Sequence, residues 1–291
     1  KELLLSPASR WAISAGQMLG AFLLGLASAA VLLVVLIVVA GVWPQHWGEL
    51  IVFTCLTIII FVAWGALRTG LITGQTTQGA GSCLAIGGVT FCNAGRANFG
   101  DKNLVDALTV SEDTFFYLVG QNANGPTGDG HAIQNAARAL GLGSSPGIDL
   151  PGRGARGTVP DRRWVDNANK QILAAQCKGH VAAAYKVACA QGFYYPDWTV
   201  GQNIGLATGQ SYLQASPLQM AVAYSAIVNG GTVWTPQIGT QIDSPSGAIV
   251  AQLPSPTFRR VYIDPAYQGL IMAGLHGAAQ SPAGTSYAVF H

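Results

Sequence analysis

Charged residues are scarce in this sequence. Only 10% of its 291 residues are Asp, Glu, Lys or Arg, whereas 50% are hydrophobic, a composition that is apolar for a soluble protein. The formal net charge is +2, and the scattered arginines form no basic stripe, so nucleic-acid binding has no support. The histidines show no H-E-x-x-H pattern. We therefore predict neither a metal nor a cofactor.

Charge is absent altogether between Trp11 and Gly48. The apolar run in this segment exceeds the roughly 20 residues that cross a hydrocarbon core of about 30 Å. Because no A-x-A-like cleavage site stands at a signal-peptide distance, we predict a retained anchor. Residues 1–48 are thus a predicted cytoplasmic stub with a transmembrane helix. Residues 70–291 are long enough for one sizeable globular domain.

Cysteines are few, but four of them are spaced for two disulfides. Cys83 and Cys92 bracket a predicted hairpin that turns at Gly87-Gly88, and counting outward from the turn places the two cysteines opposite each other. Cys177 and Cys189 could form a second pair. Two disulfides would imply an oxidising, extracytoplasmic location, whereas four reduced thiols remain the alternative. A zinc site at the second pair would lack a standard ligand spacing.

The most regular element runs from Ser216 to Gly231. Ser216 is a predicted N-cap, Pro217 suits the first helical position, and Gln219 completes a capping box. One face of this predicted helix is apolar and should pack against a core. That face carries Met220, Tyr224, Ile227 and Val228.

Three ordered blocks of the sequence, residues 86–120, 199–231 and 274–290, carry a resemblance to one family. Residues 199–231 are similar to the pattern G-Q-G-x-x-x-x-T-P-L-Q-x-A-x-A-Y-x-x-x-x-N-G-G of the class B penicillin-binding proteins, which are peptidoglycan D,D-transpeptidases. Residues 86–120 resemble the stretch around that family's second active-site motif, and residues 274–290 resemble the approach to its third. The resemblance is closest to the elongation-type branch, penicillin-binding protein 2. It implies an α+β fold like that of the serine β-lactamases, an antiparallel sheet with helical layers, preceded by the transmembrane helix.

The family's chemistry needs three motifs around one cleft: Ser-x-x-Lys, Ser-x-Asn or Ser-x-Asp, and Lys-Ser/Thr-Gly. Ser111-Glu112-Asp113 fits the second motif and follows a predicted apolar helix over residues 104–110. Laid on the first motif without gaps, Leu56 falls at the nucleophile and Ile59 at the lysine. Neither side chain can attack a carbonyl or accept a proton. The resemblance therefore places Ser111 and Asp113 in the cleft as the retained catalytic pair.

The third motif is also missing, because no lysine precedes Ser-Gly or Thr-Gly. We expect an incomplete transpeptidase-like domain over residues 70–291, inactive as written, whether as a fragment, a rearranged sequence or a natural pseudoenzyme. By resemblance, the family binds β-lactams and cross-links stem peptides that end in D-Ala-D-Ala, with a polytopic glycosyltransferase as a possible partner. The alternatives are a non-catalytic scaffold of the elongation machinery and a β-lactam sensor. Thr208, Gly209 and Gln210 are expected to be non-catalytic neighbours.

Residues 49–69 have two interpretations, a second membrane span or the helix at the nucleophile position. A second span would return the domain to the side of Lys1 and Arg10, which the positive-inside rule makes cytoplasmic. With one span, the domain lies outside a bacterial cell membrane. We favour one span, because the residues that lead into Gly70 match a buried transpeptidase helix and the cysteine pairing agrees.

Overall fold

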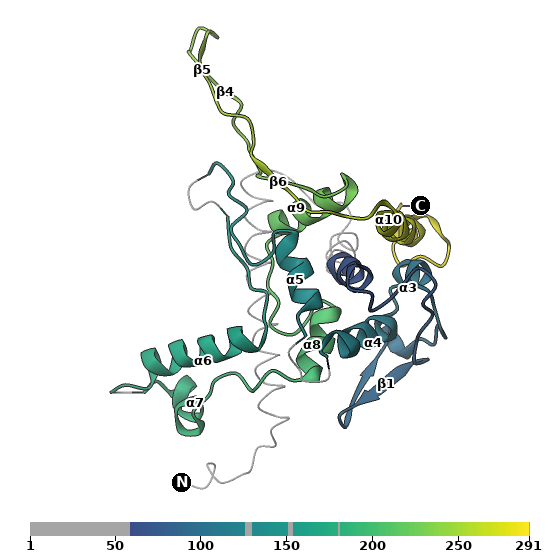
Figure 1. Ribbon diagram of the computed structural model, residues 1–291. Helices are drawn as coiled ribbons and strands as arrows, with labels where there is room; N and C mark the ends of the chain where they lie inside the picture. The colour runs from purple at the N-terminus through teal and green to yellow at the C-terminus, as the bar shows by residue number, and fades with distance from the viewer. Residues whose placement is uncertain (1–58, 126–129, 151–153, 180, 291) are drawn as a thin grey trace. The chain divides into compact units, whose positions relative to one another are not determined.

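The structure is a computed structural model that describes residues 59–125, 130–150, 154–179 and 181–290 (Figure 1). All of them belong to the second of two compact units, Gly48–His291. The predicted transmembrane helix, Cys55 and Leu56 lie outside the described residues. Among the residues described, no helix is long and apolar enough to cross a membrane.

Helices are the main regular elements of the described chain. They are residues 59–68, α3 (Leu104–Val110), α4 (Asp113–Ala123), α5 (Ala132–Ala139), α6 (Arg162–Gln176), α7 (Lys186–Gln191), α8 (Val200–Ala207), α9 (Pro217–Val228), α10 (Pro265–Gln280) and α11 (Tyr287–Phe290), with 3-10 turns at Ala94–Arg96 and Ala183–Tyr185. The strands are β1 (Cys83–Ile86), β2 (Val89–Cys92), β3 (Thr232–Trp234), β4 (Gln241–Asp243), β5 (Ile249–Gln252) and β6 (Phe258–Arg260).

The described strands form three separate two-stranded antiparallel sheets, β1–β2, β3–β6 and β4–β5. The single sheet between helical layers that the resemblance predicts is not present in the described part of the chain. Every residue of β4, β5 and β6 is exposed, including the large apolar side chains of Ile242, Ile249 and Phe258. In the described part of the chain, no helical layer therefore covers these strands. The predicted register of the first hairpin is confirmed, with Cys83 opposite Cys92 and Ile86 opposite Val89.

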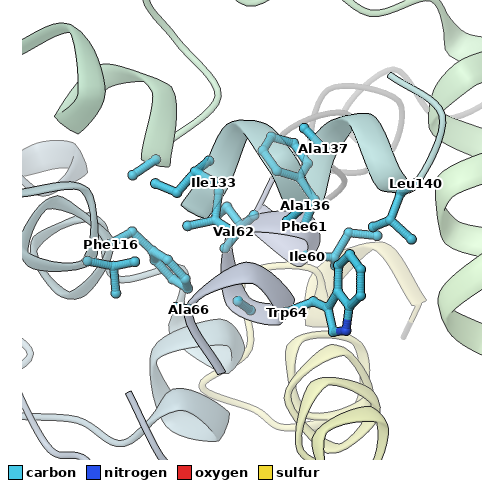
Figure 2. Packing of buried hydrophobic residues seen from close by; sticks show 14 of the residues in the cluster. Ile60, Phe61, Val62, Trp64, Ala66, Phe116, Ile133, Ala136, Ala137 and Leu140 are labelled. Carbon is cyan, nitrogen blue, oxygen red and sulfur yellow. The ribbon is translucent and has the colours of Figure 1, made fainter. Parts of the chain in front are cut away.

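The helix at residues 59–68 lies in the hydrophobic core. Its hydrophobic side chains from Ile59 to Leu67 are at most 4% exposed, as expected for a helix that is apolar on all sides. Figure 2 shows its residues among Ile133, Ala136 and Ala137 of α5 and beside Phe116 of α4. A Cβ atom on Gly65 would stand 2.8 Å from the Cβ of Ala136. Glycine therefore permits this close approach of the two helices.

Two further helix pairs are built on glycines. In α4, a Cβ on Gly120 would stand 2.8 Å from both the Cβ of Ala207 and the Cα of Ile204 in α8. The Gly120 carbonyl accepts a hydrogen bond from the buried Asn203 amide at 2.7 Å. In α10, a Cβ on Gly274 would stand 2.6 Å from the Cβ of Leu108 in α3. These close approaches fix α3 and α4, the two helices that flank the second motif.

Both cysteine pairs that the sequence indicates are disulfides. Cys83 is bonded to Cys92 and Cys177 to Cys189, with Cα–Cα distances of 4.0 and 5.5 Å. The second bond joins the end of α6 to α7. The same region is held by Asn169 of α6, whose Oδ1 accepts hydrogen bonds from the backbone N–H groups of Tyr194 and Tyr195. The chain between α6 and α8 is thus tied at several points.

The predicted cap of α9 is confirmed, but one detail of its apolar face is wrong. Ser216 is the N-cap, Pro217 begins the helix, and Gln219 closes the capping box. Ile227 is buried as predicted, whereas Val228 is 54% exposed. The Gln219 side chain is buried instead. It donates hydrogen bonds to the carbonyls of Ser144 and Arg156, which lie in the connection between α5 and α6.

Candidate functional site

The second motif forms the turn between α3 and α4. Asn103 caps the start of α3 by accepting a hydrogen bond from the Asp106 N–H, and Ser111 ends the helix in the left-handed conformation, at φ 55° and ψ 54°. Few residues other than glycine adopt this conformation, and it recurs at functional positions. Its effect is to turn the chain so that Glu112 points inward and Asp113 begins α4.

Glu112, the middle residue of the motif, is fully buried. Its Oε1 accepts a hydrogen bond from the Thr114 hydroxyl at 2.7 Å, whereas Oε2 has no hydrogen-bond partner among the described residues. Burial raises the pKa of this carboxyl, against the opposing effects of the Thr114 bond and the charge of Lys102. Glu112 therefore belongs to the interior of the turn, whereas Ser111 and Asp113 are partly exposed.

Asp113 is half-buried at the first position of α4, where the helix dipole favours a negative charge. Burial raises the pKa of its carboxyl, and a hydrogen bond from the Ala94 N–H opposes that rise. One turn along α4, burial and the nearby Asp113 charge raise the pKa of Tyr117 to about 12. The Tyr117 hydroxyl donates to the Cys92 carbonyl at 3.2 Å. The start of α4 is thus bound to the residues that follow the hairpin.

Asn93 is the residue that sequence reasoning missed. It is only 3% exposed, and its Oδ1 accepts the Thr114 N–H at 2.9 Å, 21 residues along the chain. Glu112, the N-cap of α4, gives no side-chain cap, so Asn93 supplies the missing acceptor from a distant segment. Its Nδ2 donates to the carbonyls of Gly81 and Ala97, both at 2.9 Å. No sequence pattern signals this role, because the partners are not local.

At the predicted position of the catalytic lysine, the chain places a core residue. Ile59 is 4% exposed and belongs to the same buried cluster as Leu104 and Leu108 of α3. At the other end of the helix at residues 59–68, the Arg68 guanidinium lies 5.3 Å from the centre of the Trp64 ring. An aliphatic side chain in this setting has no means of activating a serine.

The residues expected to be non-catalytic neighbours end α8. Thr208 is the C-cap of α8, Gly209 has φ +72°, and the Gln210 N–H donates to the Gly205 carbonyl at 2.7 Å. A left-handed glycine directly after the cap is a common way to close a helix. These contacts give Thr208, Gly209 and Gln210 a structural role, which is to end α8.

A concave surface with a volume of about 250 Å³ lies between α9 and the β3–β6 pair. Arg259, Thr235 and Thr257 are among the residues that line it, whereas Ser111 and Asp113 are not. Among the residues that the structure describes, no group of three or more His, Cys, Asp or Glu side chains is placed to hold a metal ion.

Taken together, the helical core, the β1–β2 hairpin and the Ser-x-Asp turn between two helices define a transpeptidase-type domain. The family model of the penicillin binding protein transpeptidase domain matches residues 57–291, and the chain belongs to this family.

Among curated relatives, the chain is similar to peptidoglycan D,D-transpeptidase MrdA. It is 29% identical to MrdA of Salmonella typhimurium strain LT2 over 240 residues, which cover 81% of this chain and 33% of the relative. It is 26% identical to MrdA of Escherichia coli strain K12 over 238 residues, which cover 80% of this chain and 32% of the relative. The chain therefore spans about a third of the length of these relatives.

Solved structures show the same fold. A peptidoglycan synthase complex matches with a TM-score of 0.61 and 22% identity, covering 81% of this chain and 33% of that one. Pseudomonas aeruginosa PBP2 in complex with WCK 5153 matches with a TM-score of 0.60 and 22% identity, covering 80% and 46%. PBP2 of Helicobacter pylori in complex with MreC matches with a TM-score of 0.58 and 22% identity, covering 80% of this chain and 36% of that one.

Proposed function

We propose that this chain acts in peptidoglycan synthesis as a transpeptidase-fold domain that does not form an acyl-enzyme through the family's first motif. Its ligand would be a stem peptide that ends in D-Ala-D-Ala, or a β-lactam that mimics it, held at Ser111 and Asp113. The observation that carries the proposal is the burial of Ile59. An aliphatic core residue occupies the place where the resemblance requires a lysine, and catalysis by the family's route needs that base.

The second motif supports ligand binding without catalysis. Ser111 is half-buried in a left-handed turn, and Asp113 is half-buried beside it. A hydroxyl and a carboxyl in this arrangement can hydrogen-bond the amide groups of a peptide.

Both disulfides support an extracytoplasmic domain, since such bonds persist in oxidising compartments. The predicted anchor over residues 11–48 would then hold the domain at the outer face of a bacterial cell membrane. The structural relatives described as a synthase complex and as a PBP2–MreC complex favour partners in cell-wall synthesis, including a polytopic glycosyltransferase. In this setting, the chain would contribute contacts to an assembly, as a scaffold or pseudoenzyme of cell elongation.

An acylating transpeptidase with its nucleophile elsewhere is the second candidate, because Ser111 keeps a hydroxyl in a conformation found at functional sites. Labelling with fluorescent penicillin separates the two candidates. The full chain in detergent, its Ser111→Ala variant and a relative with an intact Ser-x-x-Lys motif are labelled and run on a denaturing gel. We expect a band for the relative alone.

A covalent band for this chain would overturn the proposal, and mass mapping of the labelled peptide would identify the nucleophile. Loss of that band in Ser111→Ala would assign the nucleophile to Ser111. A cooperative thermal melt of the same preparation shows that an unlabelled sample is folded. Displacement of a fluorescent stem peptide by unlabelled peptide, measured by anisotropy, then tests non-covalent binding, which Ser111→Ala should weaken about tenfold through a lost hydrogen bond.

A further inference from the structure

The β1–β2 hairpin is a small element with a large share of the contacts that hold the second motif. It has two strands of four residues each, most of them only partly buried, and an isolated two-stranded hairpin is marginally stable in water. The Cys83–Cys92 bond closes its open end. Where the hairpin ends, the chain continues directly into Asn93.

Asn93 bridges the two sides of that closed end. Its N–H donates to the Ser82 carbonyl at 3.0 Å, and its Nδ2 donates to the Gly81 carbonyl at 2.9 Å. Gly81 and Ser82 directly precede Cys83, so the disulfide and Asn93 hold the same pair of chain segments together. The orientation of the Asn93 side chain therefore depends on both segments staying paired.

The other end of the Asn93 side chain holds α4. Its Oδ1 accepts a hydrogen bond from the buried Thr114 N–H. The following residue, Ala94, donates its N–H to the Asp113 carboxyl. The carbonyl of the preceding residue, Cys92, accepts a hydrogen bond from the Tyr117 hydroxyl. Consecutive residues after the hairpin thus bind the first turns of α4. The aromatic rings of Phe91 and Tyr117 add a contact, with centroids 5.5 Å apart.

We propose that the Cys83–Cys92 disulfide, acting through Asn93, positions Asp113 and the start of α4, and that reduction of this bond releases the second motif. Its consequence for ligand binding rests on the proposed function, which places the ligand at Ser111 and Asp113, whereas the structural link itself does not. Asn93 is a positioning residue in this scheme. It touches no ligand and acts through the Thr114 amide and the turn that carries the motif.

Release requires a dithiol reductant, as supplied by a protein with two neighbouring thiols. Its thiolate attacks one sulfur of the bond to give a mixed disulfide, and its second thiol then resolves that intermediate. The reductant loses two electrons and two protons and becomes a disulfide. Cys83 and Cys92 gain them and become two thiols. Without the covalent link, the marginal hairpin opens, and the carbonyl and amide groups of residues 81–94 no longer face α4.

The test compares the two disulfides of the full chain in detergent. The Cys83→Ser/Cys92→Ser variant removes the proposed link, and Cys177→Ser/Cys189→Ser is the matched control. Hydrogen exchange at the Thr114 amide, measured at neutral pH, reports the Asn93 contact. We expect exchange to accelerate by at least about tenfold in the first variant, since one lost hydrogen bond corresponds to roughly that factor, and to stay unchanged in the control.

A second readout distinguishes positioning from general stability. Burial and the Asp113 charge raise the pKa of Tyr117 to about 12, and this pKa should fall toward the ordinary value of 10 once the opened hairpin no longer covers the Tyr117 ring. Rapid pH-jump titration of phenolate absorbance measures this shift, and Tyr117→Phe identifies the signal. Two further variants keep the disulfide intact. Asn93→Ala should accelerate hydrogen exchange at the Thr114 amide, because the acceptor is lost. Asn93→Asp keeps an acceptor oxygen and should protect this amide as the parent chain does.

Unchanged Thr114 exchange and an unchanged Tyr117 titration in the Cys83→Ser/Cys92→Ser variant would overturn the proposal. So would equal effects in the control pair, because the bond would then act through overall stability. If the first variant does not fold, the Asn93 pair decides, and equal exchange in Asn93→Ala and the parent chain counts against the proposal. Neither readout involves penicillin, so an acylated chain would overturn the proposed function and leave this inference standing.

Discussion

Gln219 offers a quantitative test of how the region before α9 is held. Its side chain is 1% exposed. Oε1 accepts the Ser216 N–H at 2.9 Å, and Nε2 donates to the carbonyls of Ser144 and Arg156 at 2.8 and 2.7 Å. Gln219 therefore closes a capping box and also ties two points of the connection between α5 and α6 to the helix. Gln219→Ala removes both functions in one substitution.

The expected loss follows from these contacts. Each hydrogen bond contributes about 0.5–1.5 kcal/mol net, and a buried polar group left without a partner costs about 1–3 kcal/mol. Loss of a cap costs about 1 kcal/mol. Two orphaned carbonyls and an open cap together predict that Gln219→Ala lowers the free energy of unfolding by about 3–4 kcal/mol.

Gln202 provides the matched control. It occupies the same capping-box position in α8, where its Oε1 accepts the Thr199 N–H at 2.9 Å, and its side chain also hydrogen-bonds Tyr212. Unlike Gln219, it binds no backbone carbonyl of a distant loop among the described residues. Gln202→Ala should therefore cost about 1 kcal/mol. Urea unfolding of both variants, followed by aromatic circular dichroism, measures the difference. Values within about 0.5 kcal/mol of each other would refute the assignment of the extra stability to the loop contacts.

Three further predictions concern other parts of the fold. Gly120→Ala should force α4 and α8 apart and destabilise the domain by about 1–3 kcal/mol. Gly201→Ala is the control and should not destabilise it, because the added Cβ would meet only the Thr199 hydroxyl at 3.5 Å. Equal melting temperatures of the two variants would contradict the close packing at Gly120. Because burial raises the pKa of Glu112, the free energy of unfolding should be greatest when this carboxyl is protonated and should fall as the pH rises through its raised pKa. Glu112→Gln should remove this pH dependence. Parallel pH–stability curves for the parent chain and Glu112→Gln would contradict the prediction. Hydrogen bonds from the N–H groups of Gly239 and Ile238 lower the pKa of Asp149. These hydrogen bonds should therefore persist at neutral pH and be lost as the pH falls below the pKa of an ordinary aspartate. The chemical shift of the Gly239 amide measures this transition, and Asp149→Asn should not show it.

Sequence reasoning succeeded where the determinants are local. The register of the first hairpin follows from its Gly87-Gly88 turn, α3 spans the predicted residues 104–110, and the Ser216–Gln219 capping box forms as expected. In each case the interacting groups lie within a few residues of one another. Membership of the transpeptidase family rests on ordered motifs and was likewise accessible from sequence.

The second motif shows where local patterns stop. Its three residues are identifiable, but their spacing does not reveal that Glu112 turns into the core while Ser111 and Asp113 stay partly exposed. That division depends on the left-handed turn at Ser111. The single layered sheet was expected from resemblance, whereas the described strands stand as separate pairs. An alternating pattern in one strand does not state which strand or helix lies beside it.

The sequence by itself determined the turns, the caps, the cysteine spacing and the lack of a base at Ile59, because these depend on residue identity and near neighbours. Only the tertiary structure decided that Asn93 caps a helix 21 residues away and that Gln219 binds a carbonyl 75 residues away. A buried polar group must find a partner once water is removed. Which partner it finds depends on the packing of distant segments, and no short stretch of sequence records that choice.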